Sequence, residues 1–293
     1  MRILHLDSGR AMRGGQWQVL RLIEGLAAGG VESTLLARKG LPLLETARHR
    51  GLRVEPLGLV RAAVLARRND LIHAHDARSH TLGAIAGGAP LVVSRRVAFP
   101  VGSRWKYARA RRYLAVSEFV KSVLIGGGVP EEKIAVVYDG VPLLEQADGT
   151  GVIAPANLDD PLKGAPLAME GARLAGVELE ISANLERDLA RAAIFVYISH
   201  SEGLGSAALL AMSAGVPVIA SKTGGLPEIV RHGETGLLVE NRPEAVAAAI
   251  RELVENRELA RRLGQAGRRT VMERFTIEHL VGRTMEVYRT VLS

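Results

Sequence analysis

Short apolar runs alternate with helical patterns along almost the whole chain, and few folds accommodate such an alternation. Some runs, such as residues 90–94 and 134–138, are apolar at nearly every position, which is typical of strands buried on both faces. The spacing predicts an α/β protein built from doubly wound parallel sheets. The predicted strands are residues 1–6, 33–37, 52–56, 70–74, 90–94, 112–116, 134–138, 151–155, 177–181, 193–198, 216–220 and 236–239. The predicted helices are residues 15–28, 41–50, 59–67, 78–87, 117–126, 164–175, 185–191, 205–214, 225–231, 243–254, 256–273 and 277–291.

The pattern is interrupted at residues 139–150, where glycine, proline and acidic residues are concentrated. A chain of 293 residues is long enough for two domains, and we place the boundary between residues 1–142 and 143–293. An alternative for the last helix, about residues 277–291, is that it packs back on the first domain. Two Rossmann-like domains that face a cleft direct the carboxyl ends of their strands toward it, so the cleft is the expected ligand site.

The composition excludes several kinds of site. Cysteine is absent, so disulfides, thiolate metal ligands and cysteine nucleophiles are excluded, and a reducing compartment is expected. The first residues contain only a short apolar run before Asp7 and do not read as a signal peptide. No apolar run approaches the roughly eighteen residues that a membrane span needs. We therefore expect a cytoplasmic protein.

The net charge of +7 is concentrated in one segment, residues 95–112. Trp105 and Tyr107 are interleaved with the basic residues, and such a face suits an anionic membrane surface, a phosphorylated acceptor or nucleic acid. A solvated helix face is an equally good interpretation. Nucleic acid is disfavoured because no RNA-stacking motif is present, so we expect peripheral attachment to the inner face of the membrane. The basic residues are Arg95, Arg96, Arg104, Lys106, Arg109, Arg111 and Arg112.

Two glycine turns in the second half each join a predicted strand to a predicted helix, at residues 199–206 and 220–228. Helix N-termini offer free N–H groups and the positive end of the helix dipole, so they bind phosphate. Gly203 and Gly205 allow a ligand to approach the backbone, and the carboxylate of Glu202 accepts hydrogen bonds from hydroxyls. Amides for phosphate beside a carboxylate for hydroxyls suit a nucleotide-sugar. Lys163, at the start of another predicted helix, can face a diphosphate as a point charge.

The first half offers a weaker set of candidates. Gly14 and Gly15 lie in a strand-to-helix loop that lacks the dinucleotide fingerprint, so nicotinamide is disfavoured and a plain tight turn is equally possible. His75 and Asp76 follow a predicted strand, where a histidine can donate to a sugar hydroxyl or transfer a proton, or simply be a hydrogen-bonded loop residue. His73 and His75 also suggest a metal, but the sequence offers no third converging ligand, so no metal is predicted.

Taken together, these motifs resemble those of family 4 glycosyltransferases, enzymes of the GT-B fold that transfer sugars with retention of configuration. The resemblance covers nearly the whole chain and is most specific in the second half. The matching segments are residues 14–15, 73–76, 115–117, 137–141, 201–205, 211–212, 215–220, 224–230 and 233–238.

The resemblance implies a nucleotide-sugar donor held by the second domain, a lipid or saccharide acceptor held by the first, and no obligatory metal or other cofactor. It implies three catalytic residues: Glu202 contacts the donor-sugar hydroxyls, Lys163 neutralises the departing diphosphate, and His75 lies near the reacting sugar. Fixed amides and a lysine aimed at the leaving group would lower the barrier. The donor-binding residues it implies are Gly203, Leu204, Gly205, Ser206, Gly224, Gly225, Leu226, Asn157, Leu210, Gly14 and Gly15.

This sequence departs from the family pattern in three places. Leu210 stands where the family has a second glutamate that grips the ribose, and Asn157 stands where it usually has an arginine. The segment between Lys163 and Glu202 is short, as if one strand–helix unit were absent. All three departures weaken the donor site.

Two functional hypotheses follow. The first is a hexosyl- or related transferase with a shortened donor domain, acting on an envelope lipid or polysaccharide precursor. The second is a non-catalytic relative that binds a sugar or nucleotide or regulates another protein. A sugar-nucleotide epimerase is a remote third reading, because it needs paired carboxylates that the sequence does not supply.

Overall fold

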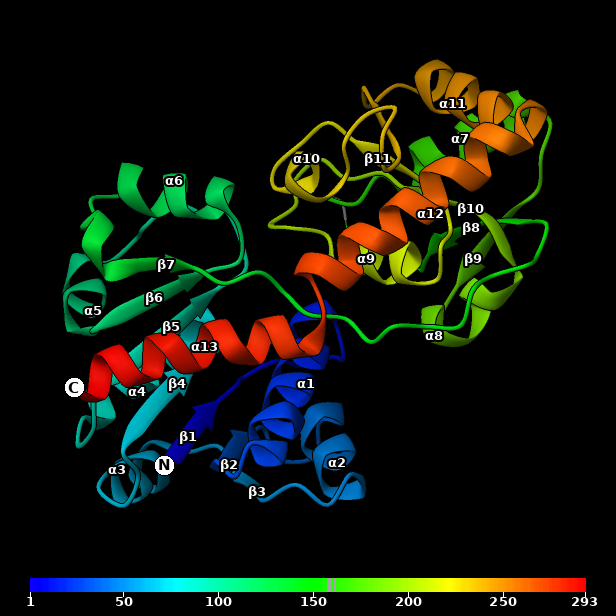
Figure 1. The fold of residues 1–293 in the computed structure, drawn as a ribbon. Coiled ribbons are helices and arrows are strands. Elements are labelled where there is room, and N and C mark those ends of the chain that lie inside the picture. Colours follow the sequence, from blue (N-terminus) through cyan, green and yellow to red (C-terminus); the bar gives the residue numbers. More distant parts are fainter. Residues whose placement is uncertain (157–159, 161) are drawn as a thin grey trace. The chain divides into compact units, whose positions relative to one another are not determined.

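The computed structural model describes residues 1–156, 160 and 162–293. These residues form two compact units, one made of Met1–Gly140 with Ile277–Ser293 and the other of Val141–Thr276. Each unit contains one parallel sheet with helices packed against it (Figure 1). The roles that the sequence analysis gave to the two domains, acceptor and donor binding, stay predictions.

The first unit contains a seven-stranded sheet with the order β3-β2-β1-β4-β5-β6-β7. Leu4 and Leu6 alternate with Ile3 and His5 along β1, so each face of the sheet receives buried side chains. The strands are β1 (Arg2–Leu6), β2 (Glu32–Ala37), β3 (Val54–Pro56), β4 (Leu71–Ala74), β5 (Leu91–Arg95), β6 (Arg112–Ala115) and β7 (Ile134–Val136). The helices are α1 (Gly14–Ala28), α2 (Pro42–His49), α3 (Leu59–Ala66), α4 (Ala77–Ala86), α5 (Arg104–Arg109), α6 (Glu118–Gly126) and α13 (Ile277–Leu292), with a 3-10 turn at Glu131–Lys133.

The C-terminal helix α13 packs in the first unit, against α1 (Figure 1). A Cβ atom on Gly25 of α1 would lie 2.5 Å from Val281 Cγ2 of α13, so only glycine permits this approach. At the other end of α13, the hydroxyl of Tyr288 lies 2.6 Å from Nδ1 of His73 in β4. The helix therefore completes the core of the sheet that the first 140 residues build.

The second unit contains a five-stranded sheet with the order β12-β11-β10-β8-β9. Its core lies between the strands and helices α7, α11 and α12, with Val196, Val246 and Leu263 fully buried. The strands are β8 (Gly151–Pro155), β9 (Leu179–Ser182), β10 (Ala192–Tyr197), β11 (Val218–Ser221) and β12 (Leu237–Val239). The helices are α7 (Ala165–Ala175), α8 (Leu185–Asp188), α9 (Ser206–Ser213), α10 (Leu226–Ile229), α11 (Pro243–Glu255) and α12 (Arg257–Arg274), with a 3-10 turn at Leu189–Arg191.

The prediction of an α/β protein with parallel sheets is confirmed, and three local predictions need correction. Helix α5 lies where no helix was predicted, because six residues are too few to display a helical period. The helix predicted over residues 225–231 ends at Ile229, and the Arg231 amide donates to the Thr235 hydroxyl instead of continuing the helix. The helix predicted over residues 185–191 divides into α8 and a 3-10 turn.

Candidate active site

The end of β10 in the second unit brings two predicted catalytic residues together. Residues 162–164 lie antiparallel to residues 198–200, with hydrogen bonds from Gly164 N to Ile198 O (2.9 Å) and from His200 N to Leu162 O (2.8 Å). A Cβ atom on Gly164 would lie 2.4 Å from Ile198 Cγ2, so glycine is required for the two segments to meet. This contact carries Lys163 to the loop that holds Glu202.

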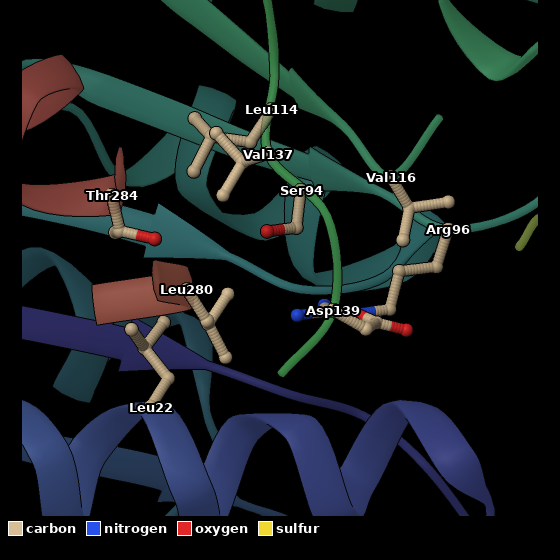
Figure 2. A pocket seen from close by; sticks show the side chains of 9 residues that line it. All are labelled: Leu22, Ser94, Arg96, Leu114, Val116, Val137, Asp139, Leu280 and Thr284. Atoms are coloured by element: carbon tan, nitrogen blue, oxygen red, sulfur yellow. The ribbon is translucent and has the colours of Figure 1, made fainter. Parts of the chain in front are cut away.

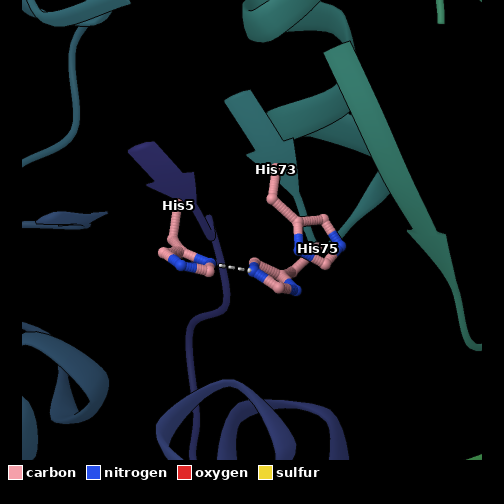
Figure 3. Close-up of side chains that lie close together, drawn as sticks. All are labelled: His5, His73 and His75. Carbon is pink, nitrogen blue, oxygen red and sulfur yellow. Dashed lines mark hydrogen bonds between the residues drawn. The ribbon is translucent and has the colours of Figure 1, made fainter. Parts of the chain in front are cut away.

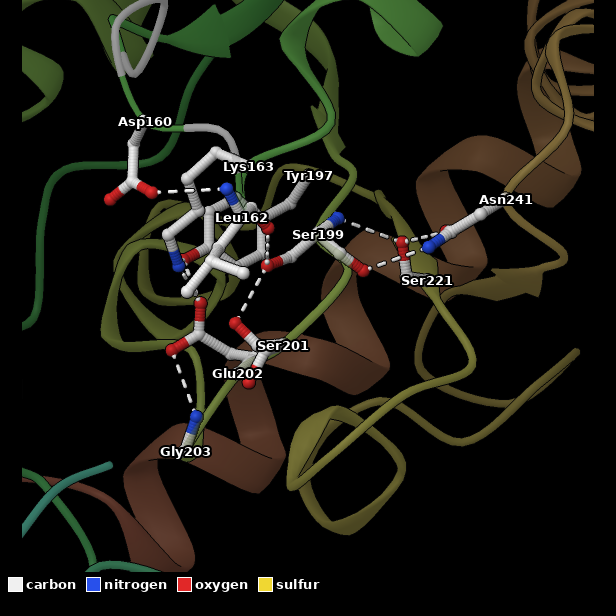
Figure 4. Close-up of polar contacts among 10 residues, drawn as sticks. All are labelled: Asp160, Leu162, Lys163, Tyr197, Ser199, Ser201, Glu202, Gly203, Ser221 and Asn241. Atoms are coloured by element: carbon white, nitrogen blue, oxygen red, sulfur yellow. Dashed lines mark hydrogen bonds and ion pairs between the residues drawn. The ribbon is translucent and has the colours of Figure 1, made fainter. Parts of the chain in front are cut away.

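The ammonium group of Lys163 forms an ion pair with Oε2 of Glu202 (Figure 4). The hydroxyl of Tyr197 donates to the same oxygen at 2.6 Å, and the amide of Gly203 donates to Oε1 at 3.2 Å. The Lys163 and Glu202 side chains are only 20% and 14% exposed. The Glu202 carboxylate is therefore held at both oxygens by three different groups.

The two glycine turns pack directly against each other. The amide of Gly225 donates to the carbonyl of Glu202 at 3.1 Å, and a Cβ atom on Gly225 would lie 2.1 Å from Gly203 O. A Cβ atom on Gly224 would lie 2.0 Å from Glu202 O, and Gly224 has a φ of +57°. Glycine is needed at both positions for close packing of backbone on backbone.

This packing narrows the predicted phosphate site to the first turn. The amides of Gly225 and Leu226 donate to protein carbonyls, and α10 is a single turn with little dipole. By contrast, the described part of the chain shows no hydrogen bond from the amides of Gly205 and Ser206 at the start of α9. These two amides are the better candidates for holding an anion.

A polar network that the sequence analysis missed fixes the ends of β10 and β11 (Figure 4). The Ser199 amide donates to Ser221 Oγ at 2.9 Å, and Ser221 Oγ donates to Asn241 Oδ1 at 2.5 Å. Asn241 Nδ2 donates to the Ser199 carbonyl at 3.0 Å, which closes the network. Tyr197 was missed as well, because a tyrosine at the end of an apolar strand looks like a core residue.

Leu210 and Asn157 are the two residues that depart from the family pattern of the donor site. Leu210 lies in α9 and is 5% exposed, and its side chain offers a ribose no hydrogen bond. Asn157 lies outside the described residues.

In the first unit, three buried histidines from two strands lie side by side (Figure 3). His5 of β1 pairs in register with His73 of β4, and His75 follows two residues later on the same face. His5 Nδ1 lies 3.0 Å from His75 Nε2, and His73 contacts Tyr288 Oη and Ser94 Oγ at 2.6 and 2.8 Å. His5 was not predicted as a member of this cluster, because residue spacing does not reveal that β1 pairs with β4.

Among the described residues, these histidines form a group that could hold a metal ion, with one ring nitrogen of each within 4.8 Å of the others. Burial lowers the pKa of each, that of His5 to about 3, so the rings are neutral at neutral pH, which is the form that binds metals. However, both nitrogens of His73 already contact hydroxyls. The buried Nδ1 of His75 lacks a partner among the described residues. The arrangement is a hydrogen-bonded cluster that leaves one nitrogen for a ligand.

Asp76 and Asp7 organise the loops beyond β4 and β1. Asp76 caps α4 and also accepts from the Ser8 amide at 2.5 Å. Burial opposes its ionisation, but hydrogen bonds from Ser79 and Ser8 outweigh burial and lower the pKa of Asp76. Burial, and then the charge of Asp76, raise the pKa of Asp7 to about 6. Asp7 accepts from Gln16 Nε2 at 3.2 Å and so ties β1 to the first turn of α1.

That first turn of α1 contains the two predicted donor-binding glycines, Gly14 and Gly15. A Cβ atom on Gly15 would contact only the Arg96 side chain, at an ordinary 3.8 Å. Packing therefore does not require glycine at position 15, in contrast to Gly164 and Gly224. Their predicted role toward a donor stays a prediction.

A small cavity of about 10 Å³ lies between α1, α13 and the sheet of the first unit (Figure 2). The ion pair between Arg96 Nε and Asp139 Oδ1, at 3.2 Å, forms one wall. The cavity is large enough for about one water molecule and too small for a sugar. It is not a candidate substrate site.

The basic segment 95–112 divides into an inward and an outward part. Arg95 is 7% exposed and Arg96 is paired with Asp139, so neither belongs to an exposed basic face. Tyr107 is also buried, which corrects its prediction as a surface aromatic. The exposed basic side chains are those of Arg104, Arg109 and Arg111, and the exposed large apolar side chains are those of Val97, Phe99 and Trp105.

Comparisons with known proteins agree with these features. Residues 12–144 match the family described as Glycosyltransferase Family 4, and residues 179–270 match Glycosyl transferases group 1. The chain is 42% identical over 110 residues to the alpha-maltose-1-phosphate synthase of Mycolicibacterium smegmatis, covering 35% of this chain and 28% of that protein. It is 38% identical over 141 residues to the D-inositol 3-phosphate glycosyltransferase of Geodermatophilus obscurus, covering 48% and 30%. The chain thus matches less than a third of the length of these two curated relatives.

Solved structures share the fold at low identity. The crystal structure of Anabaena HepE in complex with UDP and glucose superposes with a TM-score of 0.87 and 18% identity, covering 99% of this chain and 100% of that one. A glycosyltransferase from Rickettsia africae superposes with a TM-score of 0.81 and 18% identity, covering 100% and 98%. The two family matches, over residues 12–144 and 179–270, and the shared fold all indicate a glycosyltransferase. The protein belongs to the family 4, or group 1, glycosyltransferases and has the GT-B fold.

Proposed function

We propose that this chain transfers a sugar from a nucleotide-sugar to an acceptor, with retention of anomeric configuration. The observation that carries the proposal is the pairing of Lys163 with Glu202 beside the available amides of Gly205 and Ser206. One ammonium, one carboxylate and two amides match the diphosphate and the hydroxyls of such a donor. Packing alone does not call for an ion pair at the end of an apolar strand.

In the proposed reaction the bond between the sugar C1 and the diphosphate oxygen breaks, and the diphosphate leaves with the electron pair. The acceptor oxygen bonds to C1 on the face that the diphosphate left, and the acceptor proton passes to a phosphate oxygen. Negative charge grows on the leaving group in the transition state. Lys163 and the α9 amides would stabilise that charge, and such fixed donors typically contribute about two to three orders of magnitude in rate.

The choice of donor and acceptor belongs to the same proposal. HepE was crystallised with UDP and glucose, so UDP-sugars are the first donors to test. We propose a lipid or polysaccharide precursor as acceptor, because the exposed part of segment 95–112 suits an anionic surface. There the Arg109 guanidinium lies 4.4 Å from the centre of the exposed Trp105 ring. No helix in the described ranges is long and apolar enough to cross a bilayer.

A non-catalytic, nucleotide-binding role is the second candidate. Leu210 favours it, because a buried leucine stands where the family has a ribose-gripping glutamate. Loss of charged hydrogen bonds to a diol costs about 1.5–3 kcal/mol, or one to two orders of magnitude in donor affinity. A protein of this kind would bind nucleotides without turning them over.

The two candidates separate in one assay. The protein is incubated with UDP-, GDP- and ADP-sugars, and both the release of nucleoside diphosphate and the thermal shift are measured. We expect release from at least one donor, lowered about hundredfold by Lys163→Gln and unchanged by Lys39→Gln, which removes an exposed lysine of the first unit. A thermal shift without release supports the second candidate, and neither signal with any nucleotide refutes both.

The membrane proposal has its own test. Co-sedimentation with vesicles containing phosphatidylglycerol should be strong at low salt and weak at high salt. Replacing Arg104, Arg109 and Arg111 with glutamine should reduce it, whereas replacing the exposed Arg261, Arg262 and Arg269 of α12 changes the net charge equally and should have less effect. Equal loss in the two triple variants would refute a specific surface.

A further inference from the structure

Tyr197 occupies an unusual position between the two predicted catalytic residues. It is the last residue of β10 and is 5% exposed, and its ring stacks on Phe195 with centroids 6.0 Å apart. Its hydroxyl lies 2.6 Å from Glu202 Oε2 and 3.5 Å from Lys163 Nζ (Figure 4). The Tyr197 hydroxyl therefore contacts both members of the ion pair.

Glu202 Oε2 accepts hydrogen bonds from two groups in this structure, Lys163 and Tyr197. Under the proposed function, the Lys163 ammonium turns N–H groups toward the more highly charged diphosphate of the bound nucleotide-sugar, and its pairing with Glu202 weakens. The Glu202 side chain is only 14% exposed, so water replaces a lost partner poorly, and an unpaired buried charge is costly. The partners that stay are the Tyr197 hydroxyl and the Gly203 amide, one on each oxygen.

We propose that Tyr197 is a positioning residue of the donor site, whose hydroxyl keeps the Glu202 carboxylate oriented while Lys163 moves to the diphosphate. This inference rests on the proposed function and adds a residue that sequence analysis did not identify. Burial, and then the charge of Glu202, raise the pKa of Tyr197 well above its usual value, so the phenol remains a hydrogen-bond donor across the assay range. A sugar hydroxyl then takes the position that the ammonium leaves.

Replacing tyrosine with phenylalanine separates this role from packing. Tyr197→Phe keeps the ring and its stacking on Phe195 but removes the hydrogen bond to Glu202. The matched control is Tyr113→Phe, because Tyr113 is also a buried tyrosine and its hydroxyl donates to the Tyr107 carbonyl at 2.7 Å, in the first unit. Each variant loses the hydrogen bond that the tyrosine hydroxyl donates, and Tyr197→Phe also loses the long 3.5 Å hydrogen bond that the hydroxyl accepts from Lys163 Nζ.

The experiment measures the dissociation constant of UDP and the kcat and KM for UDP-glucose hydrolysis, with GDP and GDP-mannose as the second pair. For Tyr197→Phe we expect UDP affinity within about twofold of the wild type, because the diphosphate does not contact Glu202. We expect kcat/KM to fall about tenfold or more, because a charged hydrogen bond that orients Glu202 is lost. Tyr113→Phe should change neither quantity.

Three results would overturn the inference. Equal weakening of UDP binding and turnover would mean that the Tyr197 hydroxyl supports the nucleotide site as a whole and does not specifically orient Glu202. An unchanged kcat/KM would mean that the hydrogen bond to Glu202 contributes nothing to turnover. Absence of nucleotide binding by the wild type would refute the proposed function itself, and this inference would fall with it. If Tyr197→Phe does not fold, the carbon-13 shift of Tyr197 Cζ in the wild type decides. UDP should move it less than Glu202→Gln does, and an equal movement counts against a retained bond.

Discussion

Gly224→Ala tests the contact between the two glycine turns, on which the geometry of Glu202 depends. The new Cβ would lie 2.0 Å from the Glu202 carbonyl oxygen, whereas carbon and oxygen normally approach to about 3.3 Å. The turns must therefore separate by about 1.3 Å, and the hydrogen bond from Gly225 N to Glu202 O is lost. The lost bond costs about 1 kcal/mol, and a left-handed alanine costs about 1–2 kcal/mol. The sum is about 2–3 kcal/mol.

Gly233→Ala is the matched control. Gly233 lies in the same unit with a φ of +75°, close to that of Gly224, but a Cβ atom there would meet nothing within 4 Å. It should show the conformational cost alone, about 1–2 kcal/mol. The difference between the two variants isolates the contact between the turns.

Urea unfolding gives the stability of both variants, and donor hydrolysis gives their activity. A displacement of about 1 Å at a catalytic group can lower the rate about hundredfold, so kcat/KM should fall steeply in Gly224→Ala and little in Gly233→Ala. Equal losses of stability in the two variants would refute the argument, because the backbone contact would then contribute nothing.

Three further predictions concern the first unit. Burial lowers the pKa of His5, His73 and His75, so below about pH 6.5, the ordinary pKa of histidine, the unfolded chain binds more protons than the folded protein. The free energy of unfolding should therefore fall from pH 6.5 toward pH 3, by up to about 1.4 kcal/mol per histidine and pH unit. A shallower slope in His5→Gln would support this, and an unchanged slope would contradict it. The pKa of Asp7 is raised to about 6, so the contribution of its protonated carboxyl to stability is lost as the pH rises through 6. In urea unfolding, Asp7→Asn should therefore stabilise the protein more at pH 8 than at pH 4, and the reverse order would contradict the shift. Gly25→Ala should destabilise by about 1–3 kcal/mol, because its Cβ would lie 2.5 Å from Val281, whereas Gly282→Ala, with nothing within 4 Å, should stabilise by about 0.5–1 kcal/mol, as thermal unfolding would reveal.

Much of this protein could be read from its sequence, because the relevant signals are local. Strands buried on both faces are continuous apolar runs, so the order of strands and helices followed from residues close together in the chain. Glu202 and the glycine turns form a compact motif within about thirty residues, and the family resemblance rested on the same stretch.

Only the tertiary structure decided which distant residues meet. His5 joins His73 and His75 because β1 pairs with β4, and Lys163 reaches Glu202 because a glycine lets two segments touch. It also showed that the second glycine turn has a packing role, since Gly224 and Gly225 pack on the Glu202 loop and the Gly225 amide donates to the Glu202 carbonyl. Strand pairing and backbone contacts join residues that are far apart in the chain, and no local pattern records them.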